Sequence, residues 1–212
     1  MKRLLAALLV LVLCFGCACA ETADTDKYDA LPEIFKITVE ENERKVEDGK
    51  AYVYKEYVTT TNAQVNAELR ALVDAYDDEL TPTLQLDPRK KGKRGSALNI
   101  DTVYYRTGEK YLSTLTIARI SFREEQLSTA FTSRTWDLET GAQLKLTDLF
   151  AADSEAWDIL AEGVRTHMNE IFPDDPRDSE AIEALCTREA LKNADFTLSG
   201  MELTLHYAAS AV

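Results

Sequence analysis

The sequence is poor in the side chains that most often build metal centres and catalytic sites. It has two histidines, His167 and His206, and neither lies in a spacing typical of a zinc motif. No nucleophile elbow, phosphate-binding loop or dinucleotide-binding glycine pattern occurs. We therefore expect no catalytic residue, no cofactor and no metal site, with His167 at a surface and His206 in a strand.

Cysteine is also scarce outside the first 20 residues. Of the four cysteines, Cys14, Cys17 and Cys19 lie in the N-terminal segment, and Cys186 is the fourth. A mature chain with one cysteine has no internal disulfide, so a packed core has to hold the fold. Cys186 shares a predicted helical face with Ile182, which predicts a buried, inert thiol and not a nucleophile.

Basic residues are few relative to acidic ones. The chain has 24 basic and 37 acidic residues and a net charge of −13. Such a chain repels nucleic acid and anionic membranes and attracts basic partners. One loop departs from this balance and supplies weak candidates for contact with an anion, with a solvated loop as the alternative: Arg89, Lys90, Lys91, Lys93 and Arg94.

The N-terminus has the pattern of a secretory signal peptide. Lys2 and Arg3 precede an apolar run over residues 4–16, and the pattern of small residues at Ala18 and Ala20 predicts cleavage after Ala20. A retained membrane anchor and lipidation of one of the early cysteines are the alternatives. We expect residues 1–20 to be the signal peptide, residues 21–33 a flexible tail, and the mature protein to be extracytoplasmic with no membrane span, either secreted or associated with the cell envelope.

Residues 34–96 predict a subdomain of a hairpin and a helix. Alternating apolar residues indicate strands over 35–39 and 51–60 around a turn at 48–49. A helix is predicted over 61–80, with Thr61 as N-cap, Gln64 in the capping box and Pro82 as the stop. We expect the tyrosines of the second strand to pack under this helix, with a ligand platform as the alternative, and the acidic runs 77–79 and 174–175 to be solvated. Those tyrosines are Tyr52, Tyr54 and Tyr57.

Residues 97–212 predict a second domain. Strands over 99–106, 111–123 and 127–137 are joined by tight turns, which favour antiparallel pairing. A glycine turn at 139–141 leads to a return strand containing Leu144 and Leu146. A weaker helix over 179–193, broken near Thr187, and a hairpin around Gly200 follow. Between the return strand and this weaker helix we expect a helix whose buried stripe is Trp157, Leu160, Val164, Met168 and Ile171. The predicted fold is α+β, an antiparallel meander packed by amphipathic helices, and the end at residue 212 directly after a strand predicts C-terminal truncation.

Residues 135–150 read Thr-Trp-Asp-Leu-Glu-Thr-Gly-Ala-Gln-Leu-Lys-Leu-Thr-Asp-Leu-Phe. This stretch resembles the Tyr-Asp-Leu-x-Thr-Gly-Lys-x-Leu-x-Leu-x-Asp-Leu-Phe signature of a bacterial extracytoplasmic domain of unknown function. That domain is found at the C-terminus of RsiV-type lysozyme-sensing anti-sigma factors and beside PdaC-type peptidoglycan deacetylase domains. The resemblance extends over most of residues 34–207, although residues 123–126 replace the family's Gly-Gly-Ala-His loop.

The resemblance implies fold and compartment, and it suggests a partner. We expect an exported, non-catalytic binding or sensing domain of the cell envelope, whose partner is a cell-wall fragment or a basic protein such as a muramidase. The alternative functions are a peptidoglycan-modifying hydrolase or its accessory subunit, and a structural envelope protein. The sequence nominates no pair of carboxylates for hydrolysis.

Overall fold

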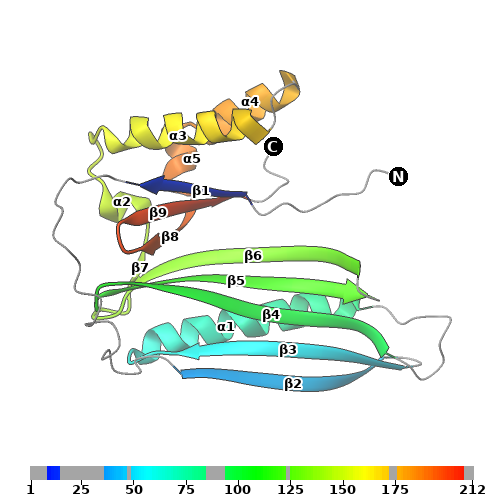
Figure 1. The fold of residues 1–212 in the computed structure, drawn as a ribbon. Coiled ribbons are helices and arrows are strands. Elements are labelled where there is room, and N and C mark those ends of the chain that lie inside the picture. Colours follow the sequence, from blue (N-terminus) through cyan, green and yellow to red (C-terminus); the bar gives the residue numbers. More distant parts are fainter. Residues whose placement is uncertain are drawn as a thin grey trace, which may run out of the picture. The chain divides into compact units, whose positions relative to one another are not determined.

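The computed structural model describes residues 9–14, 36–46, 49–84, 94–122, 125–171 and 176–207 (Figure 1). The chain divides into two compact units, each assembled from separate segments. We call Phe15–Val103 with Thr116–Phe131 the α1 unit, and Met1–Cys14, Tyr104–Leu115 and Thr132–Val212 the α3 unit. The α+β class expected from the sequence is confirmed, because a largely antiparallel six-stranded sheet is combined with helices.

The α1 unit begins with a long hairpin. Strand β2, Lys36–Val46, pairs antiparallel with β3, Gly49–Thr59, from Lys36 opposite Thr59 to Val46 opposite Gly49. Helix α1, Ala63–Leu80, follows and ends in a 3₁₀ turn, η2, Thr81–Thr83, where Pro82 breaks the helical pattern as predicted. Strand β4, Arg94–Thr107, then returns to the sheet.

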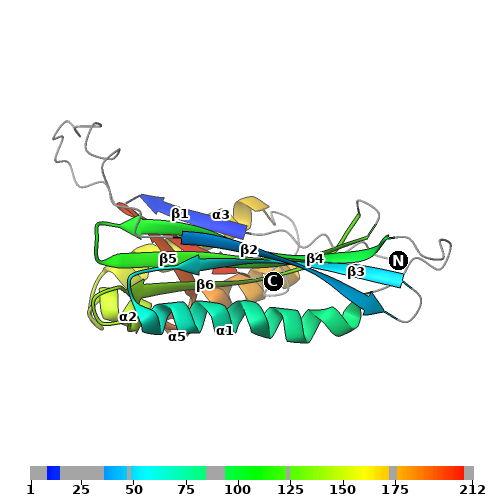
Figure 2. The ribbon, with the colours of Figure 1, turned by 90° about the horizontal axis from the view of Figure 1, so that it is seen from below.

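The pairing of β3 with β4 is an exception to the antiparallel pairing expected for the sheet. The two strands are parallel, with Tyr52 beside Ala97 and Lys55 beside Ile100. Parallel neighbours need a long crossover to bring the chain back to the same end of the sheet, and α1 provides it. The segment β3–α1–β4 is therefore a βαβ unit inside a sheet whose other strands follow the predicted meander. Figure 2 shows α1 lying along one face of these strands.

The start of α1 also differs from the prediction. Asn62, and not Thr61, is the N-cap: its side-chain oxygen accepts hydrogen bonds from the backbone N–H groups of Gln64, at 2.9 Å, and Val65, at 3.2 Å. Thr60 fixes this geometry because its hydroxyl accepts a hydrogen bond from the Asn62 N–H at 3.0 Å. Asparagine is at least as good an N-cap as threonine, so the one-residue shift costs nothing.

The core of the α1 unit lies between α1 and the sheet. Alternate residues of β3 and β4 meet the apolar stripe of the helix, and side chains of β5, Tyr111–Phe122, complete it. The buried members of this cluster are Ala51, Val53, Tyr57, Val73, Tyr76, Leu84, Leu98, Ile100, Ala118 and Ile120.

The six-stranded sheet has the order β2-β3-β4-β5-β6-β7, where β6 is Glu125–Asp137 and β7 is Gln143–Leu144. The predicted turn after Asp137 is present: the Asp137 carboxylate accepts the N–H groups of Glu139 and Thr140, and Gly141 has φ +76°. The return strand is shorter than predicted. It ends at Leu144, and Leu146 starts a helical turn, α2, Leu146–Leu149.

The helical turn α2 is stabilised by the side chain of Asp148. The Asp148 carboxylate accepts the Lys145 N–H at 2.7 Å, and the Asp148 N–H donates to the Lys145 carbonyl at 2.9 Å. This exchange favours a helical turn over a continued strand. Leu146 is consequently fully buried in the core of the α3 unit and does not alternate with its neighbours across a sheet.

Helices α3, Ala156–Ile171, α4, Pro176–Leu185, and α5, Arg188–Lys192, cover one side of the α3 unit. The predicted stripe of α3 is buried except at its end, because Ile171 in the last turn is 42% exposed. The predicted break is confirmed at Thr187, whose hydroxyl caps α5 by accepting the Ala190 N–H. The fully buried Trp157 donates its indole N–H to the Ala151 carbonyl at 2.8 Å.

The second sheet, with strand order β1-β9-β8, belongs to the α3 unit. Strand β8, Asp195–Ser199, and β9, Glu202–Tyr207, form the predicted hairpin around Gly200. Strand β1, Leu9–Cys14, lies in the predicted signal peptide and pairs antiparallel with β9, from Leu9 opposite Tyr207 to Cys14 opposite Glu202.

The outer edge of β8 is closed by hydroxyl groups. Thr135 donates its hydroxyl to the Phe196 carbonyl at 3.2 Å, and the Leu198 N–H donates to the Ser113 hydroxyl at 2.8 Å. Ser113 and Thr135 are themselves hydrogen-bonded at 2.8 Å. The Phe196 carbonyl and the Leu198 N–H are satisfied in this way and are not open to pairing with another chain. The two edges of the β8–β9 hairpin therefore differ: side chains occupy two backbone groups on one edge, and β1 pairs with the other.

Among the described helices, none combines the length and the apolar composition needed to cross a bilayer.

Candidate binding surface

The face of the α1 unit turned away from α1 is the best candidate for a binding surface. Strand alternation determines which residues lie on it. Glu40 of β2 pairs with Arg70 of α1 at 3.8 Å, so the even positions of β2 face the helix and the odd positions face away. On β3 the odd positions Val53 and Tyr57 enter the core, so the even positions face away from α1. On β4 the even positions Leu98 and Ile100 enter the core, so the odd positions face away from α1.

We call this surface the open face. It consists of Ile37, Val39, Glu41 and Glu43 of β2, Tyr52, Tyr54 and Glu56 of β3, and Asn99, Asp101 and Val103 of β4. The register places Glu41 opposite Tyr54 and Glu43 opposite Tyr52, with Asn99 and Ala97 on the far side of the two tyrosines. Each tyrosine therefore has an acidic neighbour in the adjacent strand.

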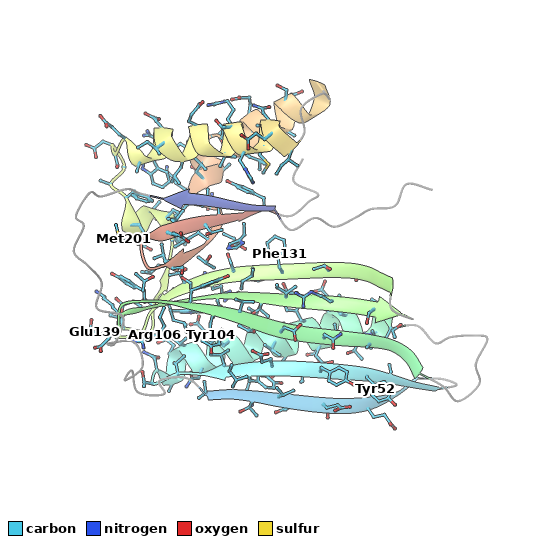
Figure 3. All side chains as sticks on the ribbon, in the orientation of Figure 1. Tyr52, Tyr104, Arg106, Phe131, Glu139 and Met201 are labelled. Carbon is cyan, nitrogen blue, oxygen red and sulfur yellow. The ribbon has the colours of Figure 1, made fainter. Side chains whose placement is uncertain are left out.

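The two tyrosines correct one expectation. Tyr57 packs under α1 as predicted, but Tyr52 and Tyr54 lie on the opposite face of β3 and are half-buried. Figure 3 labels Tyr52 on β3, and Figure 2 shows that α1 covers only one face of this part of the sheet. The alternative that the sequence left open, a ligand platform, thus has two aromatic side chains on this face.

Apolar side chains lie exposed on the same face. Ile37 is 44%, Val39 64% and Val103 42% exposed. Single exposed apolar residues are ordinary, but three of them on one sheet face beside two tyrosines form the kind of mixed patch that binds other molecules.

The open face is acidic in its centre. Asp101 follows Ile100, the partner of Lys55, and so lies beside Glu56. Burial, with the nearby charge of Asp101, raises the pKa of the Glu56 carboxyl above its ordinary value. Arg119 of β5 neutralises part of this charge through an ion pair with Asp101 at 2.6 Å. A cationic ligand group beside Glu56 would relieve the remaining repulsion.

The face of β3 under α1 holds a buried ion network instead of a ligand site. The Lys55 ammonium, on a residue that is 8% exposed, lies 3.0 Å from Asp74 Oδ1 and 3.1 Å from Asp77 Oδ2. Tyr57 donates its hydroxyl to Asp74 at 2.8 Å, and Thr81 donates to Asp77 at 2.5 Å. The expectation that Asp77 belongs to a solvated acidic run is therefore wrong, although Asp78 and Glu79 are exposed.

The hydrogen bonds of this network favour the charged forms of Lys55 and Asp74. Burial alone would lower the pKa of the Lys55 ammonium, but hydrogen bonds with Tyr57, Asp74 and Asp77 outweigh it and raise the pKa above its usual range. Burial opposes ionisation of Asp74 as well, yet the bonds from Tyr57 and Lys55 hold its pKa below the ordinary value. The network joins α1 to β3 through these ion pairs.

The remaining candidates from the sequence do not assemble into a catalytic centre in the part of the chain that the structure describes. Cys186 is buried, and burial raises the pKa of its thiol, as expected for an inert cysteine. His206 is buried in β9 beside the Thr197 hydroxyl at 3.0 Å, and burial lowers the pKa of its imidazole to about 4. His167 is partly exposed on α3. No group of potential metal ligands occurs among the described residues.

Several predicted positions lie outside the described residues. These are the cleavage-site residues Ala18 and Ala20, the acidic run 174–175 and the basic loop residues Arg89, Lys90, Lys91 and Lys93. Arg94 begins β4, but its side chain is not described.

No protein-family profile and no curated protein matches the sequence. Among solved structures, the chain is similar to a DUF3298 family protein from Pseudomonas aeruginosa PAO1, with 13% identity and a TM-score of 0.44 over 69% of this chain and 71% of that one. It is also similar to a DUF3298 family member from Bacteroides fragilis NCTC 9343, with 11% identity and a TM-score of 0.39 over 75% of this chain and 73% of that one. DUF denotes a domain of unknown function.

Proposed function

We propose that the protein is an exported, non-catalytic binding or sensing domain of the cell envelope, and that the open face of its α1 unit binds a cationic protein. The observation that carries the proposal is the composition of this face: two tyrosines, three exposed apolar residues and a group of carboxylates on the face of the sheet opposite α1. Aromatic anchors with a charged surround are typical of protein interfaces.

Charge selects the kind of partner. The chain carries a net charge of −13, and the open face adds Glu41, Glu43 and Glu56 to the local field. Complementary charge speeds encounter and excludes partners of like charge. A basic muramidase-like protein therefore fits this face better than an acidic wall polymer does. This partner, and the relationship to RsiV-type sensors and PdaC-type proteins, are parts of the proposal.

The test is binding of the purified full chain to a lysozyme, with soluble wall fragments as the second probe. We expect lysozyme binding to weaken as the ionic strength rises from about 0.01 M to about 0.15 M, because the Debye length falls from about 30 Å to about 8 Å. Absence of any salt-sensitive binding to lysozyme would overturn the proposed partner, and absence of binding to both probes would overturn the proposed function.

Two pairs of charge reversals locate the surface. Glu41→Lys with Glu43→Lys changes the open face, whereas Asp78→Lys with Glu79→Lys changes exposed positions on α1 by the same net charge. We expect the first pair to weaken lysozyme binding by about tenfold or more, equivalent to about 1.4 kcal/mol, and the second to have much less effect. Equal effects would mean that only the overall charge attracts the partner and that the open face is not the interface.

The second candidate, a peptidoglycan-modifying hydrolase, lacks a comparable basis. It needs two carboxylates in a cleft with separated pKa values. Glu56 and Asp101 are the acidic neighbours of the open face, but Asp101 is committed to Arg119, and both lie on a sheet face. If purified protein cleaved wall polymer, and if Glu56→Gln abolished that activity, the hydrolase function would replace the binding function.

A further inference from the structure

A pocket in the α3 unit gathers positive charge on an acidic chain. It has a volume of about 120 Å³ and lies between β6, β7 and the segment that joins α5 to β8. Its cations come from three places in the sequence: Arg134 on β6, Lys145 after β7 and Lys192 at the end of α5. None of these residues is in the basic loop that the sequence suggested as an anion contact.

Hydrogen bonds between side chains and backbone groups join the walls of the pocket. The Thr135 hydroxyl donates to the Phe196 carbonyl at 3.2 Å, which joins β6 to β8. The Ser133 N–H donates to the Asp195 carboxylate, a second link between the same strands. A pocket whose walls are joined by such hydrogen bonds holds its polar groups in fixed positions, which is what recognition of a small ligand requires.

The three cations are only lightly engaged within the described residues. Lys192 pairs with Glu189 at 3.6 Å, and Arg134 donates to the Gln143 side-chain oxygen at 3.5 Å, a long contact. Lys145 has no ion-pair partner in the part of the chain that the structure describes. Positive groups with spare donors around a concave surface are suited to a carboxylate, which accepts charge-assisted hydrogen bonds.

Asp195 adds a carboxyl group to the lining of the same pocket. Its side chain reaches the surface, yet the surrounding protein raises the pKa of its carboxyl, and the Ser133 N–H and the charge of Arg134 act in the opposite direction. An anion alone would be repelled by this carboxylate. A ligand that also carries an ammonium group would satisfy it. The pocket also has apolar lining from Leu144 and Phe196, and its volume allows only a small ligand.

We infer that this pocket binds a small zwitterionic amino acid. The ligand carboxylate lies against Arg134, Lys145 and Lys192, and its ammonium group lies against Asp195. The site is separate from the open face, so it adds a small-molecule ligand to a protein-binding surface, and either can fail without the other.

Three probes of nearly equal size test the inference on the full chain by isothermal calorimetry and by amide chemical shifts. Alanine carries both charged groups, lactate only the carboxylate, and alaninamide only the ammonium. We expect alanine to bind at least about tenfold more tightly than either analogue, with shifts at residues 143–145 and 192–196. Equal binding of alanine and lactate would show a plain anion site and overturn the ammonium contact, and no binding of alanine would overturn the site altogether.

Matched variants assign the two ends of the ligand. Lys192→Gln should weaken alanine binding several-fold, whereas Lys110→Gln, which removes another partly exposed lysine with one carboxylate partner, should not. Asp195→Asn should remove the preference for alanine over lactate. If Lys192→Gln and Lys110→Gln behaved alike, or if Asp195→Asn kept the preference, the assignment would be wrong. The wild-type comparison of the three probes decides the question even if a variant folds poorly.

Discussion

The buried network of Lys55 allows a sharp prediction about stability. Replacing Lys55 with methionine keeps most of the volume and the apolar stem but removes the charge. Asp77, with a side chain that is 6% exposed, would then hold a carboxylate without its cation. Breaking a buried pair by removing one partner typically costs about 3–5 kcal/mol, and the whole stability of a domain is about 5–15 kcal/mol. We therefore expect Lys55→Met to remove a large part of the stability of the α1 unit.

The assay is urea denaturation of the full chain at neutral pH, followed by circular dichroism. Arg119→Met is the control in the same unit, because it removes a cation from a pair with side chains that are 38% and 45% exposed. Exposed pairs contribute about 0.2–1 kcal/mol, so the control should lose much less. Adding Asp77→Asn to Lys55→Met should restore part of the loss, since no uncompensated charge stays at that position. A loss below about 1 kcal/mol for Lys55→Met would refute the reasoning that the pair is buried and coupled.

Three further predictions concern single features. Asn62→Ala should cost about 1 kcal/mol through loss of the N-cap of α1, read from thermal melting, whereas Thr61→Ala should have little effect if the cap is at Asn62. The imidazole of His206 has its pKa lowered from 6.5 to about 4 by burial, so the unfolded chain binds this proton first and stability should fall by about 3 kcal/mol between pH 6.5 and pH 4. Urea titrations of the wild type and of His206→Gln test this slope, and an unchanged slope in the variant would contradict it. Hydrogen exchange at β9 should be slow in the full chain and faster in a chain from which residues 1–20 have been cleaved, and equal rates would show that β1 does not protect β9.

Local sequence signals predicted the local structure well. The stripe of Trp157, Leu160 and Val164 has helical spacing, and burial of the three confirms it. The turn at Gly200 was equally predictable from the sequence, since its φ of +60° is a conformation that glycine adopts without strain. These features depend on residues within a few positions of one another, so periodicity and turn chemistry suffice.

The parallel pairing of β3 with β4 could not be read in the same way. The contact between Tyr52 and Ala97 is set by where α1 delivers the chain, and no pattern inside either strand records it. The same holds for the pocket of the α3 unit, which combines residues 133–145 with residues 192–196. Pairings at such separations are decided by the packing of the whole unit.

Two structural features that the sequence analysis did not predict nevertheless had a signal in the sequence. Tyr52 and Tyr54 have even numbers and Tyr57 an odd one, so in a regular strand they cannot all face the same helix. Lys55 shares its parity with Val53 and Tyr57, which places a cation on the apolar face, and Asp74 and Asp77 of the helix are one turn apart. A lysine in a core-facing position predicts a carboxylate partner.

Strands β4, β5 and β6 each contribute residues to both units, because the boundaries at residues 103, 115 and 131 fall inside them. No single cut in the polypeptide can release either unit whole. A cut between Leu84 and Arg94 would divide the buried cluster of the α1 unit, which extends from Ala51 to Ile120, and would place β1 and its partner β9 of the α3 unit on different fragments.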